Sequence, residues 1–189
     1  MSDATGAGGA KPLAQRRVYT GRVISLDVDT IRFPDGSTGE LEMIRHPGAS
    51  AVVPFVSDPR GPDPQVVLIK QYRYASNGYL VEIPAGRLEP GEQPHACAVR
   101  ELQEETGCSA ERIEPLMTLY TTPGFTDERI HLFMATGLTM GRASYDPDEF
   151  IEVRTYSLSD ALAMIERGEI TDAKTALGLL YCAGFRGDR

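Results

Sequence analysis

The sequence has few cysteines and no long apolar run, and each shortage excludes a class of protein. Its three cysteines are odd in number and lack metal-ligand spacing, which argues against a disulfide framework. We therefore expect reduced, buried thiols in a cytoplasmic protein. No apolar run approaches the length of a membrane span. Residues 1–15 lack the apolar segment of a signal peptide and are expected to form a disordered tail.

The sequence also has few histidines and no run rich in Lys or Arg. Its three histidines, His46, His95 and His131, stand at no metal-ligand spacing, so we expect structural roles for them. The formal net charge is -8 and no basic cluster offsets it. This balance argues against a nucleic-acid backbone as partner.

The 189 residues fit one domain of about 150 residues with an additional N-terminal piece. After the tail, residues 16–46 alternate in polarity and contain the turn sequence at 34–37, which predicts a small antiparallel β-sheet. Residues 47–185 are the main domain, where apolar strand candidates alternate with helical segments. The fold class expected is α/β or α+β, with a mixed β-sheet flanked by helices.

One stretch, residues 85–108, organises the main domain. It starts as a loop with closely spaced Gly and Pro, and it becomes a helix after Pro94, which suits a first helical turn. Gly107 is expected to end the helix. The helix places Glu101, Glu104 and Glu105 on one side, where like charges repel. Arg100 is adjacent to Glu104 and can tether it, while the apolar Val99 and Leu102 are expected to pack on a sheet.

Such crowded carboxylates have two interpretations. A charge-rich helix face is often simply solvated. Alternatively, a hard divalent cation removes the repulsion, and Mg²⁺ is commonly held by a few carboxylates together with substrate phosphates. Glu92, which precedes the helix, can fold back over the same face.

The whole pattern favours the metal site, because it resembles the Nudix box. That motif is Gly, five residues, Glu, seven residues, Arg-Glu, an apolar residue, any residue, Glu-Glu, any residue, Gly and an apolar residue. The positions that fill it are Gly86, Glu92, Arg100, Glu101, Leu102, Glu104, Glu105, Gly107 and Cys108. The resemblance implies a Nudix fold, a divalent metal (Mg²⁺, with Mn²⁺ as a possible substitute) and hydrolysis of a diphosphate linked to another group.

The resemblance also implies roles for individual residues. The implied metal ligands are the backbone carbonyl of Ala85 and the carboxylates of Glu101, Glu104, Glu105 and Glu149. The implied catalytic residues are Arg100, Glu104, Glu105 and Glu149. Glu149 follows an acidic stretch, Asp146-Pro147-Asp148, that is otherwise typical of a solvated loop. The general base stays open between Glu149, Glu152 and a glutamate of the box.

A second stretch, residues 122–128, narrows the substrate class. Pro123 and the following Gly-Phe-Thr-Asp-Glu resemble the ADP-ribose pyrophosphatase group of the family. The substrate-binding candidates that this resemblance implies are Arg45, Arg73, Glu82, Gly124 and Phe125. A guanidinium can engage two phosphate oxygens at once. The alternatives are a surface ion pair for either arginine and core packing for Phe125.

The function expected is metal-dependent hydrolysis of ADP-ribose, a small-molecule substrate, to AMP and ribose 5-phosphate. Two alternatives stay open: another nucleoside diphosphate sugar, such as GDP-mannose, and a non-catalytic nucleotide-binding module. In the group that the sequence resembles, an N-terminal sheet mediates dimerisation and helps to bind the adenosine part. We therefore expect a homodimer through residues 16–46, with neither nucleic acid nor a membrane as partner.

Overall fold

A computed structural model describes residues 12–145, 147 and 149–184. The chain divides into two compact units, and each is described by itself. The first contains the chain up to Pro47 together with Tyr120–Arg129, and the second contains Gly48–Leu119 and the chain from Ile130 onward.

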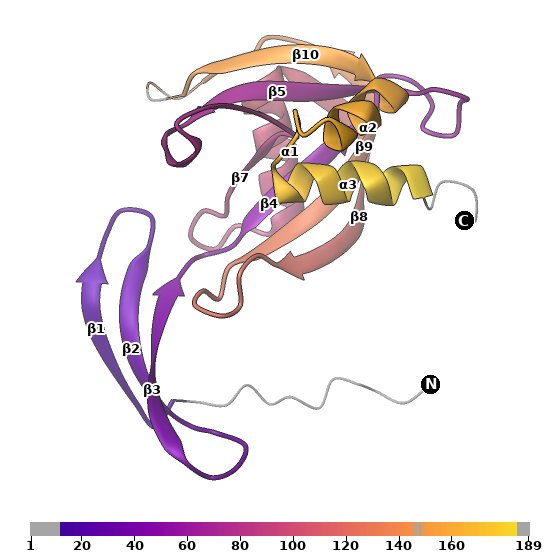
Figure 1. The fold of residues 1–189 in the computed structure, drawn as a ribbon. Helices are drawn as coiled ribbons and strands as arrows, with labels where there is room; N and C mark the ends of the chain where they lie inside the picture. The colour runs from indigo at the N-terminus through magenta and orange to yellow at the C-terminus, as the bar shows by residue number, and fades with distance from the viewer. Residues whose placement is uncertain (1–11, 146, 148, 185–189) are drawn as a thin grey trace. The chain divides into compact units, whose positions relative to one another are not determined.

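The first unit is a three-stranded antiparallel sheet with strand order β1-β2-β3 (Figure 1). Its strands are β1 (Ala14–Thr20), β2 (Ser25–Arg32) and β3 (Thr38–Arg45). Gly36 has φ +89° in the turn between β2 and β3, where the sequence predicted a Pro-Gly turn. The sequence suggested that the sheet begins at residue 16, and β1 begins two residues earlier. Residues 1–11 of the predicted tail lie outside the described residues.

The strands of the second unit form two sheets. One has the order β7-β4-β9-β8 and the other β10-β5-β6. Their bounds are β4 (Ala49–Pro54), β5 (Gln65–Arg73), β6 (Gly78–Glu82), β7 (Ala85–Arg87), β8 (Cys108–Tyr120), β9 (Arg129–Met140) and β10 (Ile151–Ser157). β4 is parallel to β9 and antiparallel to β7, so the four-stranded sheet is mixed. The predicted α+β class with helices flanking a mixed sheet is confirmed.

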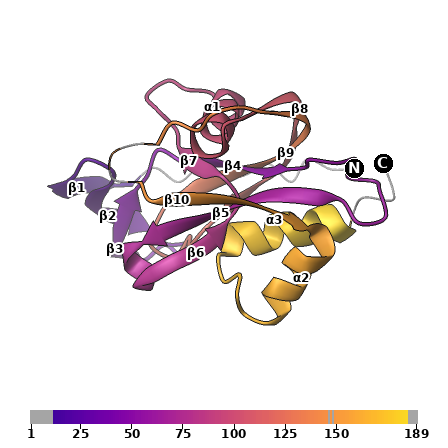
Figure 2. The same cartoon turned by 90° about the horizontal axis from the view of Figure 1, so that it is seen from above.

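Three helices cover this unit: α1 (Pro94–Thr106), α2 (Leu158–Glu166) and α3 (Ala173–Gly184). Successive residues of β4 point to opposite faces, as strand geometry requires. Val52 packs with Ala98 and Leu102 of α1, whereas Ala51 and Val53 pack in the larger core that α2 and α3 cover. Figure 2 shows α1 on one side of the strands and α2 with α3 on the other. This arrangement fixes the acidic helix α1 against β4 and β7.

Several boundaries differ from the sequence-based expectation. β8 begins at Cys108, directly after the glycine that ends α1, and β9 continues to Met140. β7 lies within the stretch that was expected to be only a loop. Val99 was expected to pack on the sheet, but its side chain is 42% exposed and only Leu102 is buried. Among the described residues, no helix is both long and apolar enough to cross a membrane.

Candidate active site

The site is built from the loop that leads into α1 and from α1 itself. Pro94 occupies the first helical turn, and Gly107 ends the helix with φ +74°, both as predicted. Gly86 faces the helix so closely that a Cβ at this position would overlap the carboxylate of Glu101. A side chain at position 86 would therefore displace the Glu101 carboxylate, because the backbone of β7 passes directly beside it.

Arg100 holds the carboxylates of this region together. Its Nε and Nη2 each donate to Glu92 at 2.9 Å, so the glutamate that precedes the helix does fold back over it. Its Nη1 donates to Glu101 at 2.5 Å and to Glu104 at 3.0 Å. The hydrogen bond from Arg100 lowers the pKa of Glu92 to about 2. Arg100 thus orients three carboxylates, as the sequence suggested.

Glu101 and Glu105 are the buried members of the cluster. Glu105 is 1% exposed and accepts a hydrogen bond from the backbone N–H of Ala85 at 2.8 Å. Burial raises its pKa to about 8, although the Ala85 N–H opposes the shift, and the charge of Glu101 adds to it. Burial also raises the pKa of Glu101, against the attraction of Arg100. Two carboxylates are therefore held one helical turn apart in a buried environment that disfavours their ionised form.

Glu149 belongs to the same electrostatic environment. Its negative charge is one of the causes that raise the pKa of Glu101 and of Glu105. Glu152, the other loop candidate for the general base, instead forms an exposed ion pair with Arg154 at 2.7 Å. Asp146 and Asp148 of the predicted acidic stretch lie outside the described residues.

The donor set fits a hard divalent cation in chemistry and charge. Glu101, Glu105 and Glu149 offer carboxylate oxygens, and the charge of Glu149 is one of the causes that raise the pKa of Glu101 and of Glu105, an effect that a dication would reverse. In the part of the chain that the structure describes, no three His, Cys, Asp or Glu side chains converge into a ready-made ligand group. The oxygens engage protein donors instead, since Arg100 binds Glu101 and Glu104 while Ala85 binds Glu105.

Arg73 and Glu82, both predicted on the substrate side, are partners of each other. Arg73 donates from Nε and Nη2 to the two oxygens of Glu82, at 2.8 and 2.9 Å. Lys174 of α3, which sequence reasoning missed, also forms an ion pair with Glu82. Burial alone would raise the pKa of Glu82, but the two cations outweigh it and the pKa lies below its usual range. Glu82 is therefore an internal anchor for Arg73.

The remaining predicted substrate residues, Arg45, Gly124 and Phe125, belong to the first unit. Arg45 forms ion pairs with Asp27, Asp29 and Asp127, so its guanidinium is already engaged by carboxylates. These pairs favour the ion-pair alternative for Arg45.

Gly124 and Phe125 lie in the loop at 122–128 that the sequence singled out. The carbonyl of Phe125 accepts a hydrogen bond from Ile44 at 2.8 Å, which fixes the loop to the end of β3. The Phe125 side chain is 50% exposed, which argues against the core alternative. A Cβ on Gly124 would meet no atom within 4 Å, so packing does not require glycine there.

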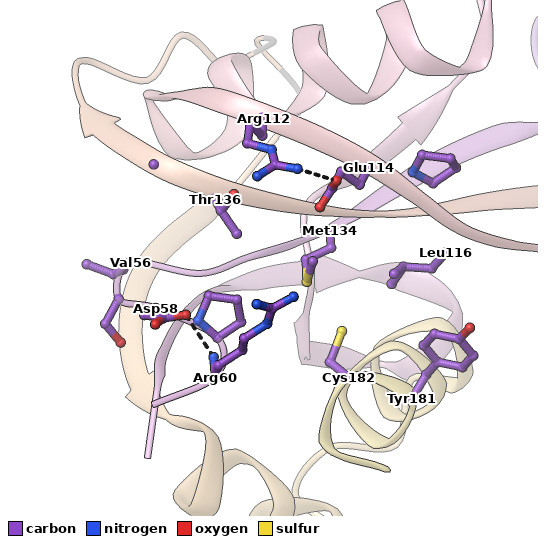
Figure 3. A pocket seen from close by; sticks show the side chains of 14 residues that line it. Val56, Asp58, Arg60, Arg112, Glu114, Leu116, Met134, Thr136, Tyr181 and Cys182 are labelled. Carbon is purple, nitrogen blue, oxygen red and sulfur yellow. Dashed lines mark hydrogen bonds and ion pairs between the residues drawn. The ribbon is translucent and has the colours of Figure 1, made fainter. Parts of the chain in front are cut away.

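A separate pocket of about 790 Å³ lies between the loop at residues 56–60, β8, β9 and α3 (Figure 3). Arg112, which lines it, forms an ion pair with Glu114 at 2.7 Å. None of the predicted site residues lines this pocket. We therefore do not assign this pocket as the candidate active site.

Comparison with known proteins agrees with the motif and the fold. Residues 46–176 match the family model described as NUDIX domain. Over 173 residues, 90% of this chain and 91% of each relative, the chain is 39% identical to an ADP-ribose pyrophosphatase of Bacillus subtilis and 40% identical to a methanol dehydrogenase activator of Bacillus methanolicus. The crystal structure of an ADP compounds hydrolase superposes with a TM-score of 0.78 at 21% identity, covering 93% of both chains, which shows the same fold.

Proposed function

The chain belongs to the Nudix family, and on that premise we propose that it hydrolyses the diphosphate of ADP-ribose to AMP and ribose 5-phosphate in the presence of a divalent ion. The observation that carries the proposal is the complete set of motif carboxylates on α1 and in the loop before it, with Arg100 bound to Glu92, Glu101 and Glu104. Every acidic position of the motif is intact, which speaks against a non-catalytic module.

The substrate class has two supports. The loop at residues 122–128 resembles the ADP-ribose pyrophosphatase group, and a relative with that name is 39% identical over most of both chains. Phe125 offers an exposed ring for stacking, and Gly124 leaves room for a ligand to approach the backbone. Arg73 offers a guanidinium edge to the diphosphate, whereas the guanidinium of Arg45 is engaged by three carboxylates. GDP-mannose and related nucleoside diphosphate sugars are the alternative substrates.

Glu101, Glu104, Glu105 and Glu149, with the carbonyl of Ala85, would hold the ion, for which we propose Mg²⁺ with Mn²⁺ as a substitute. When bound, a divalent ion neutralises phosphate charge and acidifies a water molecule. Arg100 keeps Glu101 and Glu104 oriented by direct hydrogen bonds. Glu101 and Glu105 are buried, whereas the side chain of Glu104 is 45% exposed, so the ion would lie at the boundary between the protein and solvent.

For the general base we favour Glu149. It acts electrostatically on both buried glutamates, so its carboxylate belongs to the charged environment in which the attacking water must lose a proton. Glu152 is less suited, because it forms an ion pair with Arg154 on the exposed strand β10. A glutamate of the box is the remaining alternative.

We further propose a homodimer formed through the sheet at residues 16–46. Every residue of β1 is exposed in the single chain, and the strand carries the apolar side chains of Val18 and Tyr19. An exposed strand edge with apolar side chains is a common pairing surface. A cytoplasmic location is also proposed, supported by three cysteines that are all free and buried.

The proposed function is tested by incubating the purified protein with ADP-ribose and Mg²⁺ and separating the products. We expect equimolar AMP and ribose 5-phosphate, with no product after the ion is chelated and full recovery when Mg²⁺ is restored. Binding of ADP-ribose without cleavage under all ionic conditions would instead support the nucleotide-binding module.

A further inference from the structure

The first turn of α3 carries a lysine whose ammonium group is largely buried. The side chain of Lys174 is 12% exposed, and its Nζ contacts Glu82 as well as Asp172, the latter at 3.0 Å. Lysine is rarely buried unless paired. Both partners of Lys174 are acidic, so its charge is balanced inside the protein rather than directed to solvent.

Glu82 is the centre of this cluster. It is 1% exposed, and Arg73 and Lys174 bind its oxygens from two sides. Arg73 uses only Nε and Nη2 for Glu82, and its Nη1 makes no hydrogen bond to any described residue. The Arg73 side chain is 38% exposed. One edge of the guanidinium is therefore fixed, and the other is available to a ligand.

The same turn of α3 is tied to the backbone that leads into the active-site loop. Asp172 accepts hydrogen bonds from the backbone N–H and the hydroxyl of Thr175, at 2.9 and 2.5 Å. The Thr175 hydroxyl accepts one from the backbone N–H of Ile83 at 2.8 Å. Two residues further on, Ala85 donates to Glu105. The chain between Glu82 and Ala85 is thus held by α3 at one end and by α1 at the other.

We propose that Lys174 is a positioning residue, which holds Glu82 so that the free edge of Arg73 faces the diphosphate of the substrate. Arg73, Lys174, Glu82 and Asp172 together have no net charge. Without Lys174 the Glu82 carboxylate would be held by Arg73 alone and could turn together with the guanidinium, so the free edge of Arg73 would no longer be fixed toward the diphosphate. This loss of orientation weakens binding of a diphosphate through Arg73. Lys174 itself does not reach the ligand, because its Nζ is occupied by two carboxylates.

This inference rests on the proposed function only for the identity of the substrate, so the first probe is inorganic pyrophosphate. The Kd of pyrophosphate is measured by titration calorimetry for the wild-type protein, for Lys174→Met and for a matched control, Lys70→Met. In the wild-type protein the ammonium of Lys70 lies over the Tyr79 ring. We expect Kd to rise about tenfold for Lys174→Met, the size of one lost charged hydrogen bond. We expect no change for Lys70→Met, and partial recovery for Lys174→Arg.

A double-mutant cycle separates positioning from direct contact. In an Arg73→Met background, Lys174→Met should cause no further loss of pyrophosphate affinity. With ADP-ribose as substrate, Lys174→Met should raise KM about tenfold and change kcat less than about threefold. An additive loss in the Arg73→Met background, or an unchanged Kd for Lys174→Met, would overturn the proposal.

Unfolding of Lys174→Met would not prevent the test. The paired variant Glu82→Gln with Lys174→Met removes both buried charges together and avoids an orphaned carboxylate. It should show the same rise in Kd, because Arg73 loses its charged anchor, and an unchanged Kd would again overturn the proposal. If the wild-type protein does not hydrolyse ADP-ribose, the proposed function fails, while the pyrophosphate measurements still decide the role of Lys174.

Discussion

The backbone at Gly86 lies against the carboxylate of Glu101 with no room for a side chain between them. This contact links the loop to the helix at the position where a metal ligand is expected. It explains physically why the motif has glycine six residues before Glu92.

Gly86→Ala should therefore displace Glu101. Because the atoms displaced are the end of a flexible side chain, we expect a loss of less than about 1 kcal/mol in the free energy of unfolding and a large fall in metal-dependent activity. Gly184→Ala is the matched control, since a Cβ there would meet no atom within 4 Å. Urea unfolding and activity assays on both variants provide the test, and a Gly86→Ala enzyme with normal stability and rate would refute the packing argument.

The raised pKa of Glu105 predicts a pH-dependent stability in chelator. Burial lifts this pKa to about 8 in the folded protein, whereas an unfolded glutamate titrates near 4.3. Between these values the folded state retains a proton that the unfolded state has lost, so stability falls as pH rises through this window and is unaffected below it. Thermal unfolding in chelator from pH 4 to 9 measures the effect.

Glu105→Gln removes this titration. At pH 8.5 the metal-free variant should melt about 5 °C above the wild-type protein, and the difference should vanish near pH 4. Glu104→Gln is the control, because the Glu104 side chain is 45% exposed. Equal melting temperatures for Glu105→Gln and wild type at pH 8.5 would show that burial does not disfavour the charge of Glu105.

Substitution can distinguish the roles of Glu149 and Glu152, the two candidates for the general base outside the box. Glu149→Gln should lower kcat by at least about 100-fold, the range for a lost general base. Glu152→Gln should stay within about twofold, because Glu152 only pairs with Arg154 at the surface. Steady-state kinetics with saturating Mg²⁺ decide between them, and the reverse ranking would assign the base to Glu152.

The N-terminal sheet predicts a quaternary structure. A chain that begins at residue 46 should sediment as a monomer and show a raised KM for ADP-ribose, because the sheet is expected to supply the dimer contact and part of the adenosine site. The kcat of this shortened chain should change less than its KM. Analytical ultracentrifugation of the full chain gives the decisive comparison, since a full-length monomer would remove the basis for this proposal.

Local signals in the sequence were sufficient for the acidic helix. Pro94 and Gly107 marked its ends. These features depend on neighbours along the chain. Val99 was placed wrongly because helical periodicity gives the faces of a helix but not which neighbouring element covers them.

The Lys174 contact could not be predicted in the same way. Lys174 and Glu82 are 92 residues apart, and only the packing of α3 brings them together. β7 was missed because it has three residues and is stabilised by pairing with β4 rather than by its own sequence. Long-range contacts therefore determined what the sequence left open, while the motif spacing had already located the carboxylates.

We propose that this chain is a metal-dependent hydrolase with ADP-ribose as its preferred substrate. The most direct measurement compares kcat/KM for ADP-ribose, GDP-mannose, UDP-glucose, NADH and diadenosine polyphosphates in Mg²⁺, with a chelated control for each. We expect the highest kcat/KM for ADP-ribose and no turnover of any compound in chelator. A higher kcat/KM for another compound, or turnover that survives chelation, would contradict it.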